Sequence, residues 1–332
     1  MVSIIIPSYK RSDRIERAIN SILQQTYSDY EIIVVDDNNP DTEYRKVLAE
    51  KMKHYQDNPK VKYVQHEKNK NGAAARNTGI SIAQGEYIAF LDDDDYYFPN
   101  RLQELVNALE QNKKYNAAYS TTIVTRKGKV IGRVDAVGSG NWKKELLLQQ
   151  FSLGTGSNLF FRAETLKKIN GFDEKFQRHQ DIEVMVRFFR ENELLAINKP
   201  LVVKVQDDRS NEPKVDRYLQ VKEVYYSTFK QDLEHFTKQE QNLFYAQNYS
   251  NVYNAAIKNK EYSRCKGLRQ KIETYQKWTI KNRVQAFLLF LNNYIRIENV
   301  KYLFKRIKVS SQINQEEKQY IKQMEKKREV VK

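Results

Sequence analysis

The sequence has little cysteine, little histidine and no long apolar run. Among its 332 residues there are one cysteine, Cys265, and four histidines. A single cysteine excludes a disulfide framework and a cysteine-rich zinc or iron–sulfur site. The four scattered histidines argue against a metal site built from imidazoles. The longest uninterrupted apolar run, residues 286–291, is much shorter than the roughly 20 residues of a membrane-spanning helix.

The start of the chain also lacks the features of a secretion signal. The apolar run at residues 2–6 is short, has no basic segment before it and ends at Pro7. This pattern predicts a β-strand and not a signal peptide. The composition, 40% hydrophobic and 30% charged, is typical of a globular protein. We therefore expect a folded cytoplasmic protein.

Negative charge is scarce in the last part of the chain. The sequence has 57 Lys and Arg residues against 42 Asp and Glu residues, and residues 261–332 alone carry 18 of the former and 7 of the latter. A basic tail attracts anionic surfaces, either nucleic acid or acidic lipid headgroups, although a solvated helix surface has the same composition. The asymmetry predicts that the two parts of the chain have different roles.

The first hundred residues alternate apolar strands with amphipathic helices. Strands are predicted at residues 2–6, 31–35, 61–64 and 87–91, and helices at 15–23, 44–55 and 73–83. Ser12-Asp13 and Asn71-Gly72 are the expected starts of the first and third helices. This alternation predicts an α/β fold with a mostly parallel sheet and helices on both faces.

The rest of the chain divides into an irregular middle and a helical end. The middle predicts a strand pair at 117–124 and 129–134, a strand at 158–161, and helices at 163–169 and 182–190. Beyond about residue 218 Gly and Pro nearly vanish and the pattern is helical, with a closing segment, 312–332, that is polar nearly all round. We predict a first domain at 1–215, with halves at about 1–100 and 101–215, and a basic helical region at 216–332.

Polar side chains gather where the predicted strands end. Asp36-Asp37 follows the second strand, and Asp92-Asp93-Asp94-Asp95 follows the fourth. The carboxyl ends of neighbouring parallel strands meet at one edge of a sheet, where ligands bind in open α/β folds. Adjacent carboxylates repel one another unless a cation or hydrogen-bond donors take up their charge. Mg²⁺ or Mn²⁺ with a diphosphate suits this chemistry, but a solvated acidic turn ahead of a helix explains the same residues.

Two further residues have two interpretations each. Asp37 leads into Asn38-Asn39-Pro40, residue types that form turns for local hydrogen-bonding reasons, but a carboxylate at a strand end also accepts hydrogen bonds from a ribose or a base. Tyr9, which follows the first strand, either stacks on a base or packs beside the sheet.

Taken in order, several segments resemble the inverting family-2 glycosyltransferases of the GT-A fold, of the bacterial surface-polysaccharide type. The segments are Ser3-Ile4-Ile5-Ile6-Pro7-Ser8-Tyr9, residues 18–27, the strand 31–37, Ala74-Ala75-Arg76-Asn77, Leu91-Asp92-Asp93-Asp94, Gly171-Phe172-Asp173-Glu174 and Gln180-Asp181. The resemblance spans residues 2–205, and the order and spacing of the motifs make it specific. It implies a Rossmann-like, nucleotide-binding GT-A sheet flanked by helices, with the helical region as an extension.

The resemblance also implies roles for single residues. Pro7, Tyr9 and Asp37 line the base pocket, with Asp37 accepting a hydrogen bond from a base N–H. Arg76 lies near the nucleotide. Asp92 and Asp93 hold the ribose and metal-bound water. Asp94 binds Mn²⁺ or Mg²⁺ directly, with Asp92 beside it, and the metal bridges the diphosphate.

Asp181 is implied as the general base, which takes the proton of an acceptor hydroxyl during in-line attack on the anomeric carbon. One such attack inverts the configuration of that carbon. The position of Asp181 just before a predicted helix also suits an N-cap. Two departures stand out: the family usually has an acidic pair where this chain has Gln180-Asp181, and Gln206-Asp207-Asp208-Arg209 replaces a basic or His-containing loop.

The implied partners are a nucleotide-sugar donor, a UDP-sugar first of all, and a hydroxyl acceptor on a glycan or a lipid-linked precursor of a cell-surface polysaccharide such as a capsule. A nucleotidyltransferase of similar fold is the rival enzyme, but it requires a glycine-rich basic loop after the first strand, and Pro7-Ser8-Tyr9-Lys10-Arg11 has no glycine. A nucleic-acid-binding protein leaves the carboxylates unexplained, so no nucleic acid is expected. An inactive relative has no need of Asp94 and Asp181.

The basic end of the chain carries two apolar stripes with helical spacing. One contains Val284, Phe287, Leu288, Leu291, Tyr294 and Ile295, and the other Val300, Leu303, Phe304 and Ile307. A basic amphipathic helix can lie on an anionic membrane surface. Peripheral association with the inner face of the membrane is therefore one expectation, and packing on the first domain or in an oligomer is the other.

Overall fold

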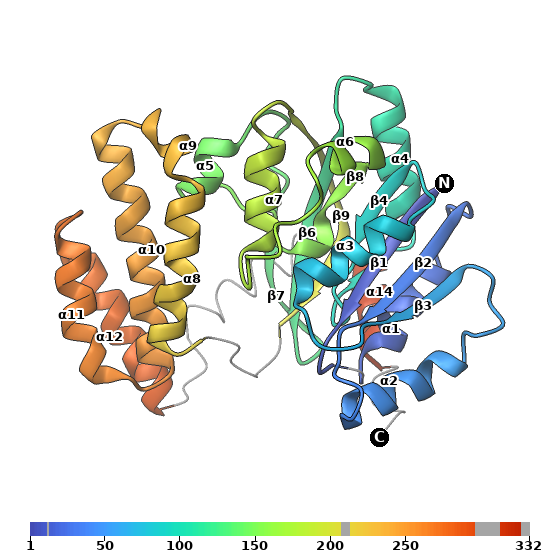
Figure 1. Cartoon of the computed structure of the whole chain (residues 1–332), viewed down its shortest axis with the longest axis horizontal. Coiled ribbons are helices and arrows are strands. Elements are labelled where there is room, and N and C mark those ends of the chain that lie inside the picture. The colour runs from blue at the N-terminus through green and yellow to red at the C-terminus, as the bar shows by residue number, and fades with distance from the viewer. Residues whose placement is uncertain (12, 207–212, 296–312, 327–332) are drawn as a thin grey trace. The chain divides into compact units, whose positions relative to one another are not determined.

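The computed structural model of the chain describes residues 1–11, 13–206, 213–295 and 313–326. It divides into two compact units. The first comprises Met1–Lys143, Ser152–Asp207 and Arg306–Lys332, and the second comprises Lys144–Phe151 and Asp208–Lys305. In Figure 1 the first unit holds the sheet and the second consists of helices. The main division lies a few residues before the predicted one at 215.

A mixed sheet, nine-stranded over the described residues, forms the frame of the first unit. Its order is β3-β2-β1-β4-β8-β6-β9-β5, with β7 paired to β6. The strands are β1 (Val2–Ser8), β2 (Tyr30–Asp36), β3 (Val61–Gln65), β4 (Tyr87–Phe90), β5 (Tyr96–Tyr97), β6 (Ala117–Arg126), β7 (Lys129–Val134), β8 (Phe160–Arg162) and β9 (Leu194–Val205). The four strands β3, β2, β1 and β4 are parallel to one another. Their carboxyl ends therefore share one edge, as predicted.

The second half of the sheet corrects the expectation of a mostly parallel arrangement. β6 and β9 are parallel, but β8 is antiparallel to both of its neighbours, and β5 and β7 are antiparallel to their partners. Strand direction is not encoded in a short apolar run, because the connection between strands decides it. The strands β5 and β9 were themselves absent from the prediction. β9 contains Asn198, Lys199 and Pro200, which interrupt its apolar pattern.

Helices cover both faces of this sheet. They are α1 (Ile15–Leu23), α2 (Glu43–Lys53), α3 (Gly72–Ile82), α4 (Arg101–Gln111), α6 (Ala163–Lys168), α7 (Gln180–Phe188) and α14 (Gln315–Lys326). Val2, Ile4 and Ile6 of β1 join a buried cluster with α1, α2 and α4, whereas Ile5 lies against Gly79 of α3. Because alternate side chains of a strand point to opposite faces, β1 is buried on both sides, which explains why three apolar residues, Ile4, Ile5 and Ile6, follow one another at its centre.

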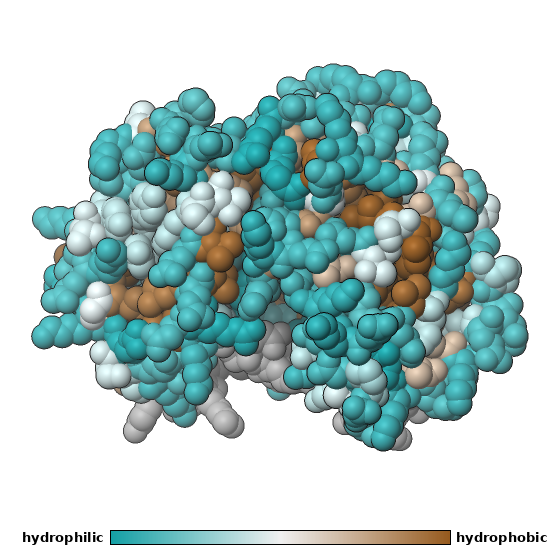
Figure 2. All heavy atoms as spheres, viewed as in Figure 1, coloured by the Kyte–Doolittle hydropathy of each residue, from teal (hydrophilic) through white to brown (hydrophobic). Residues whose placement is uncertain are grey.

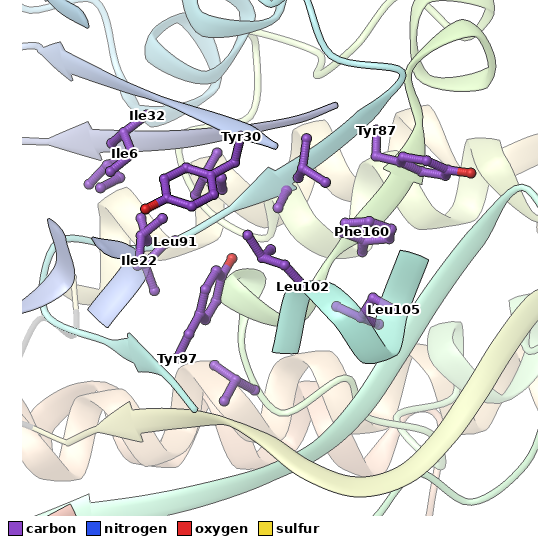
Figure 3. Packing of buried hydrophobic residues seen from close by; sticks show 14 of the residues in the cluster. Ile6, Ile22, Tyr30, Ile32, Tyr87, Leu91, Tyr97, Leu102, Leu105 and Phe160 are labelled. Carbon is purple, nitrogen blue, oxygen red and sulfur yellow. The ribbon is translucent and has the colours of Figure 1, made fainter. Parts of the chain in front are cut away.

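The core on the α1–α4 face is dense with aromatic rings. Figure 3 shows Tyr87 beside Phe160, and Tyr97 close to Leu102. The rings of Tyr87 and Phe160 stack with their centroids 5.3 Å apart. The hydroxyl of Tyr97 donates to the carbonyl of Phe90 over 2.6 Å, so this buried phenol is satisfied. The packing fixes the end of β4, from which the acidic run emerges.

The last described helix belongs to the first unit, which corrects the prediction that 216–332 forms one region. Ile321 and Met324 of α14 are buried in a cluster with Tyr96 of β5 and Val203 of β9. The hydroxyl of Tyr320 donates to the carbonyl of Tyr97 over 2.8 Å. The segment looked polar nearly all round because only a narrow stripe of its surface is apolar, and that stripe is what packs.

The second unit is a set of helices with its own small cores. It contains α8 (Val215–Thr228), α9 (Lys230–Glu234), α10 (Lys238–Lys258), α11 (Tyr262–Glu273) and α12 (Ile280–Ile295), together with most of α5 (Lys143–Leu147). One core joins α8, α10 and α11, and a second surrounds Trp278. Lys144 of α5 pairs with Glu240 of α10. Among the described residues, we find no helix with the length and apolar content that a membrane span requires. The predicted stripe at Val300, Leu303, Phe304 and Ile307 lies outside them, as do residues 207–209 of the second departure.

Candidate active site

The four carboxylates that follow β4 point to different partners. Asp92 accepts a hydrogen bond from Arg76 over 2.6 Å, and Asp93 accepts one from the hydroxyl of Ser8 over 2.8 Å. Asp94 forms an ion pair with Arg11. Asp92 is partly exposed, whereas Asp93 and Asp94 are buried. The run is therefore a divided set of groups and not one open acidic turn.

Burial and mutual repulsion raise the pKa values of the middle carboxyls. For Asp93 burial has the largest effect, followed by the charge of Asp94. For Asp94 burial again raises the pKa, and the guanidinium of Arg11 opposes it. Arg17 of α1 lies on the same side and donates to the carbonyl of Asp94 over 2.6 Å. Two buried acids with raised pKa values therefore lie near arginines, and positive charge close to them stabilises their ionised form.

Asp95 has a structural role that the sequence did not reveal. It accepts hydrogen bonds from the hydroxyls of Thr155 and Ser157, over 2.8 and 2.6 Å, and from the backbone N–H of Val205 over 3.0 Å. Burial, together with the charge of Asp94, raises its pKa to about 7. The Ser157 hydroxyl in turn accepts from the backbone N–H of Asp92 over 2.9 Å. Asp95 thus fixes the 155–157 loop against the start of the acidic run.

Arg76 joins the donor half of the unit to the acceptor half. It lies on α3, and its guanidinium donates to Asp92 over 2.6 Å and to the side-chain oxygen of Gln180 over 2.7 Å. Its planar group also lies over the ring of Phe172, 5.5 Å from the centroid. Gln180 is the neutral residue that replaces the first acid of the predicted pair. The structure gives it a definite task, because its side-chain oxygen holds Nη1 of Arg76 while Asp92 holds Nη2.

Asp92, Arg76 and Asp181 converge on one glycine. A methyl group built on Gly156 would lie 3.8 Å from Nη2 of Arg76, and 3.9 Å from both Cβ of Asp181 and Oδ2 of Asp92. Asp92 follows the end of β4, Arg76 lies on α3 and Asp181 lies at the start of α7. The sequence predicted each of them as a site residue, and the structure brings them together. Gly156 itself was missed, although it stands in a glycine-rich stretch.

Asp181 is not the N-cap of α7, which corrects one interpretation of the sequence. The helix begins at Gln180, and the residue before it, His179, takes the cap position with a left-handed φ of 61°. Asp181 lies within the first turn, where the helix dipole favours a negative charge. Its Cβ lies beside Gly156, 3.9 Å from where a methyl group on that glycine would stand.

The predicted base-binding residues lie at the end of β1 and β2. Pro7 is partly exposed in β1, opposite Val35 of β2. Tyr9 follows β1 with 41% of its surface exposed, and the ammonium of Lys10 lies 4.9 Å from its ring centroid. The exposed part of the ring lies at the carboxyl edge of the sheet and is available for stacking.

Asp37 is buried and fully engaged. It accepts hydrogen bonds from the side chain of Asn69 and the backbone N–H groups of Lys70 and Asn71, over 2.6, 2.8 and 3.0 Å, and it contacts Nδ1 of His66 over 2.7 Å. A carboxylate has about four acceptor positions, so a base N–H has to displace one of these donors. Asn69 and His66 contact it through side chains, and the amide of Asn69 is the easier of the two to displace, because His66 is buried and its other ring nitrogen is bonded to Thr78.

A divalent cation fits the chemistry of this edge in one particular way. Within the described residues, no three His, Cys, Asp or Glu side chains are grouped to hold a metal ion. The carboxylates of Asp92 and Asp94 are hard oxygen donors, and burial disfavours the ionised form of Asp94 and raises its pKa. The residues therefore suit a metal that takes most of its ligands from a bound diphosphate and water.

Comparison with known proteins identifies the family. The model of glycosyl transferase family 2 matches residues 3–169. The chain is 31% identical over 198 residues to the Escherichia coli UDP-Glc:alpha-D-GlcNAc-diphosphoundecaprenol beta-1,3-glucosyltransferase WfgD, covering 60% of this chain and 73% of that protein. It is 28% identical over 191 residues to the amylovoran biosynthesis glycosyltransferase AmsB of Erwinia amylovora, covering 56% of this chain and 62% of that protein.

The crystal structure of S. aureus TarS has a similar fold. The two superpose with a TM-score of 0.52 over 88% of this chain and 54% of TarS, at 17% sequence identity. The predicted GT-A type α/β fold is thereby confirmed, and the family match confirms the resemblance drawn from the motifs. The chain belongs to glycosyl transferase family 2 and is a glycosyltransferase.

Proposed function

We propose that the protein transfers a sugar, with inversion, from a UDP-sugar to a hydroxyl group of a glycan or lipid-linked acceptor in cell-surface polysaccharide synthesis. The observation that carries this proposal is the meeting of Asp92, Arg76 and Asp181 around Gly156. Asp181 is a partly exposed acid of the acceptor half, and its Cβ lies near the same point as Oδ2 of Asp92. WfgD uses a UDP-linked donor and a diphosphoundecaprenol acceptor, and AmsB serves amylovoran synthesis, by their names. Both names support a donor and an acceptor of these kinds.

The donor would lie along the carboxyl edge of β2, β1 and β4. Tyr9 stacks on the base, and Asp37 accepts from it in exchange for the amide of Asn69. Asp92 and Asp93 contact the ribose side. Arg76 then lies where the diphosphate meets the sugar, since its guanidinium is held between Asp92 and Gln180.

In the chemical step the acceptor oxygen forms a bond to the anomeric carbon, and the bond from that carbon to the diphosphate oxygen breaks. The electron pair leaves with the diphosphate, and Asp181 takes the hydroxyl proton. Attack from the face opposite the leaving group inverts the anomeric carbon. Asp94, with Asp92 beside it, would hold Mn²⁺ or Mg²⁺, which as a Lewis acid offsets charge on the leaving diphosphate. Arg76 stabilises the same charge through a preorganised donor.

Titration calorimetry with UDP and GDP, with and without Mn²⁺, tests the donor and the metal. We expect UDP to bind more tightly than GDP, the binding to require Mn²⁺, and Asp94→Ala to abolish the metal dependence. A transfer assay with a UDP-sugar tests the base: Asp181→Asn should keep UDP affinity and lose turnover by at least about 10²-fold. Asp216→Asn, at an exposed carboxylate of the second unit, is the matched control. UDP binding that ignores the metal, or full turnover in Asp181→Asn, would refute the proposal.

A further inference from the structure

Exposed apolar side chains are concentrated in one part of the second unit. Among the described residues, ten large hydrophobic side chains are exposed, and six of them lie between Tyr262 and Phe290. The six are Tyr262 on α11 and Ile280, Val284, Phe287, Leu288 and Phe290 on α12. We call them, with the helix segments that carry them, the α11–α12 surface. Figure 2 shows hydrophobic patches breaking the hydrophilic surface of the helical unit.

The four aliphatic and aromatic residues at the centre share one face of α12. Ile280, Val284, Phe287 and Leu288 follow the spacing i, i+4, i+7 and i+8, which places them on one stripe. Ile280 is 77% exposed and Phe287 is 59% exposed. The ring of Phe290 contacts that of Tyr262, with centroids 5.3 Å apart. Tyr262 of α11 therefore lies beside Phe290, a further exposed ring of α12.

The same segment is strongly basic. Residues 262–295 contain seven Lys or Arg residues and a single acid, Glu273. Lys266, Lys271 and Lys277 are exposed, as is Arg283. An apolar stripe flanked by cations on a pair of helices has the composition of a surface that lies in the interface of an anionic bilayer.

A cavity lies next to the stripe and adds a place for a phosphate group. It has a volume of about 400 Å³ and opens between α10, α11 and α12. Arg269 and Arg283 contribute two guanidinium groups to its lining, and Trp278 and Phe287 contribute aromatic walls. A pocket with cations at its wall and apolar groups at its rim suits the headgroup and upper chain of an anionic lipid.

Two other occupants explain these features less well. A second copy of the chain would bring the same excess of positive charge against this one, and like charges repel across an interface. Nucleic acid matches the cations, but its phosphates and sugars give no partner for aliphatic side chains such as Ile280 and Val284. A bilayer surface with acidic headgroups satisfies both the stripe and the charge.

We propose that the α11–α12 surface docks the protein on an anionic phospholipid membrane, with α12 lying in the plane of the interface. Phe287 and its neighbours on the stripe enter the headgroup and acyl boundary. The lysines and arginines around them contact lipid phosphates, and Arg269 and Arg283 take one headgroup in the cavity. The proposal concerns the second unit only and stands whether or not the first unit transfers a sugar.

Vesicle flotation of the full chain tests the proposal. We expect binding to vesicles of phosphatidylglycerol and phosphatidylcholine, little binding to phosphatidylcholine alone, and weaker binding as salt rises. Phe287→Asp and Ile280→Asp should each weaken binding about tenfold or more, because apolar burial is lost and a negative charge faces the acidic headgroups. Ile280 is the safer variant for folding, since it is almost fully exposed and begins α12, where an acid is favoured.

Val137→Asp is the matched control, because Val137 is an exposed apolar residue of the first unit. It should bind vesicles like the unsubstituted protein. Arg283→Glu tests the headgroup contact and should remove most of the preference for phosphatidylglycerol. Equal binding of Ile280→Asp and Val137→Asp would overturn the proposal. So would self-association that Ile280→Asp abolishes, or a single-stranded RNA affinity that the vesicles do not compete with.

Discussion

Substituting Gly156 by alanine, with the same substitution at two other glycines for comparison, gives the sharpest test of where the reaction takes place. At Gly156 the added methyl group would touch Arg76, Asp181 and Asp92 at 3.8 to 3.9 Å, which is ordinary van der Waals contact. It needs no movement of its neighbours, so the fold should tolerate it. The methyl group nevertheless fills the point on which the three site residues converge, and this is where the proposed reacting atoms must lie.

The expected loss follows from that geometry. Displacing a reacting group by about 1 Å costs on the order of 10²-fold in rate, which corresponds to about 2.7 kcal/mol of transition-state stabilisation. We therefore expect Gly156→Ala to lower kcat/KM by about 10²-fold. The free energy of unfolding should stay within about 1 kcal/mol of the original, since alanine also restricts the unfolded chain.

Two matched alanine variants separate this effect from others. At Gly79 the methyl group would lie 2.4 Å from Cγ2 of buried Ile5, so Gly79→Ala should cost about 1–3 kcal/mol of stability through overpacking. At Gly267, in α11, nothing lies within 4 Å, so Gly267→Ala should stabilise the helix by about 0.5–1 kcal/mol and leave turnover unchanged. Thermal unfolding and a UDP-sugar transfer assay on all three measure both quantities. A Gly156→Ala protein that keeps full kcat/KM would refute the placement of the reaction.

Three further outcomes are expected. Arg76→Lys should lower kcat/KM by roughly 10- to 150-fold, because one ammonium cannot bridge Asp92 and Gln180 and a charge-assisted hydrogen bond is worth about 1.5–3 kcal/mol; unchanged kinetics would contradict the bridge. Burial alone raises the pKa of Glu31, but hydrogen bonds from a lysine, a serine and a backbone N–H outweigh the burial and hold the pKa below its ordinary value. The ionised Glu31 therefore stabilises the fold above about pH 4.3. This stabilisation is lost as the pH falls through the folded-state pKa. In urea unfolding from pH 7 to pH 3 Glu31→Gln should therefore differ from the original protein at neutral pH and converge with it in acid, and a constant difference would count against this cause. Met324→Ala should cost about 2–5 kcal/mol in the same assay, whereas a frayed helix would show almost no change.

The parallel half of the fold was predictable because its apolar runs are complete. β1, β2 and β4 are buried on both faces and each has an unbroken apolar run at its centre, so the strands stand out from the helices between them. β9 did not stand out, because half of it lies at the edge of the core and carries polar residues. α14 was misjudged for the opposite reason: its few apolar side chains are all in contact with the sheet.

The residues of the site could be predicted from the sequence, but the contacts between them could not. Asp92, Arg76 and Asp181 were expected from the motifs, and the structure shows how they meet. The contact between Arg76 and Gln180 joins residues 104 positions apart, and no local pattern encodes such a pair. The four contacts to Asp37 from residues 66–71 were hidden for the same reason, since these residues lie about 30 positions along the chain and two of the donors are backbone groups.

The place of α14 in the sheet unit has a consequence for the order in which the protein is made. Tyr96 and Val203 leave the ribosome long before Ile321 and Met324, which complete their cluster. Until then the cluster at β5 and β9 lacks the side chains that α14 contributes to it. The sheet unit therefore reaches its final packing only after translation passes residue 326. A nascent chain halted before α14 would expose apolar side chains of β5 and β9 that α14 otherwise contacts, and chaperones and proteases could bind them.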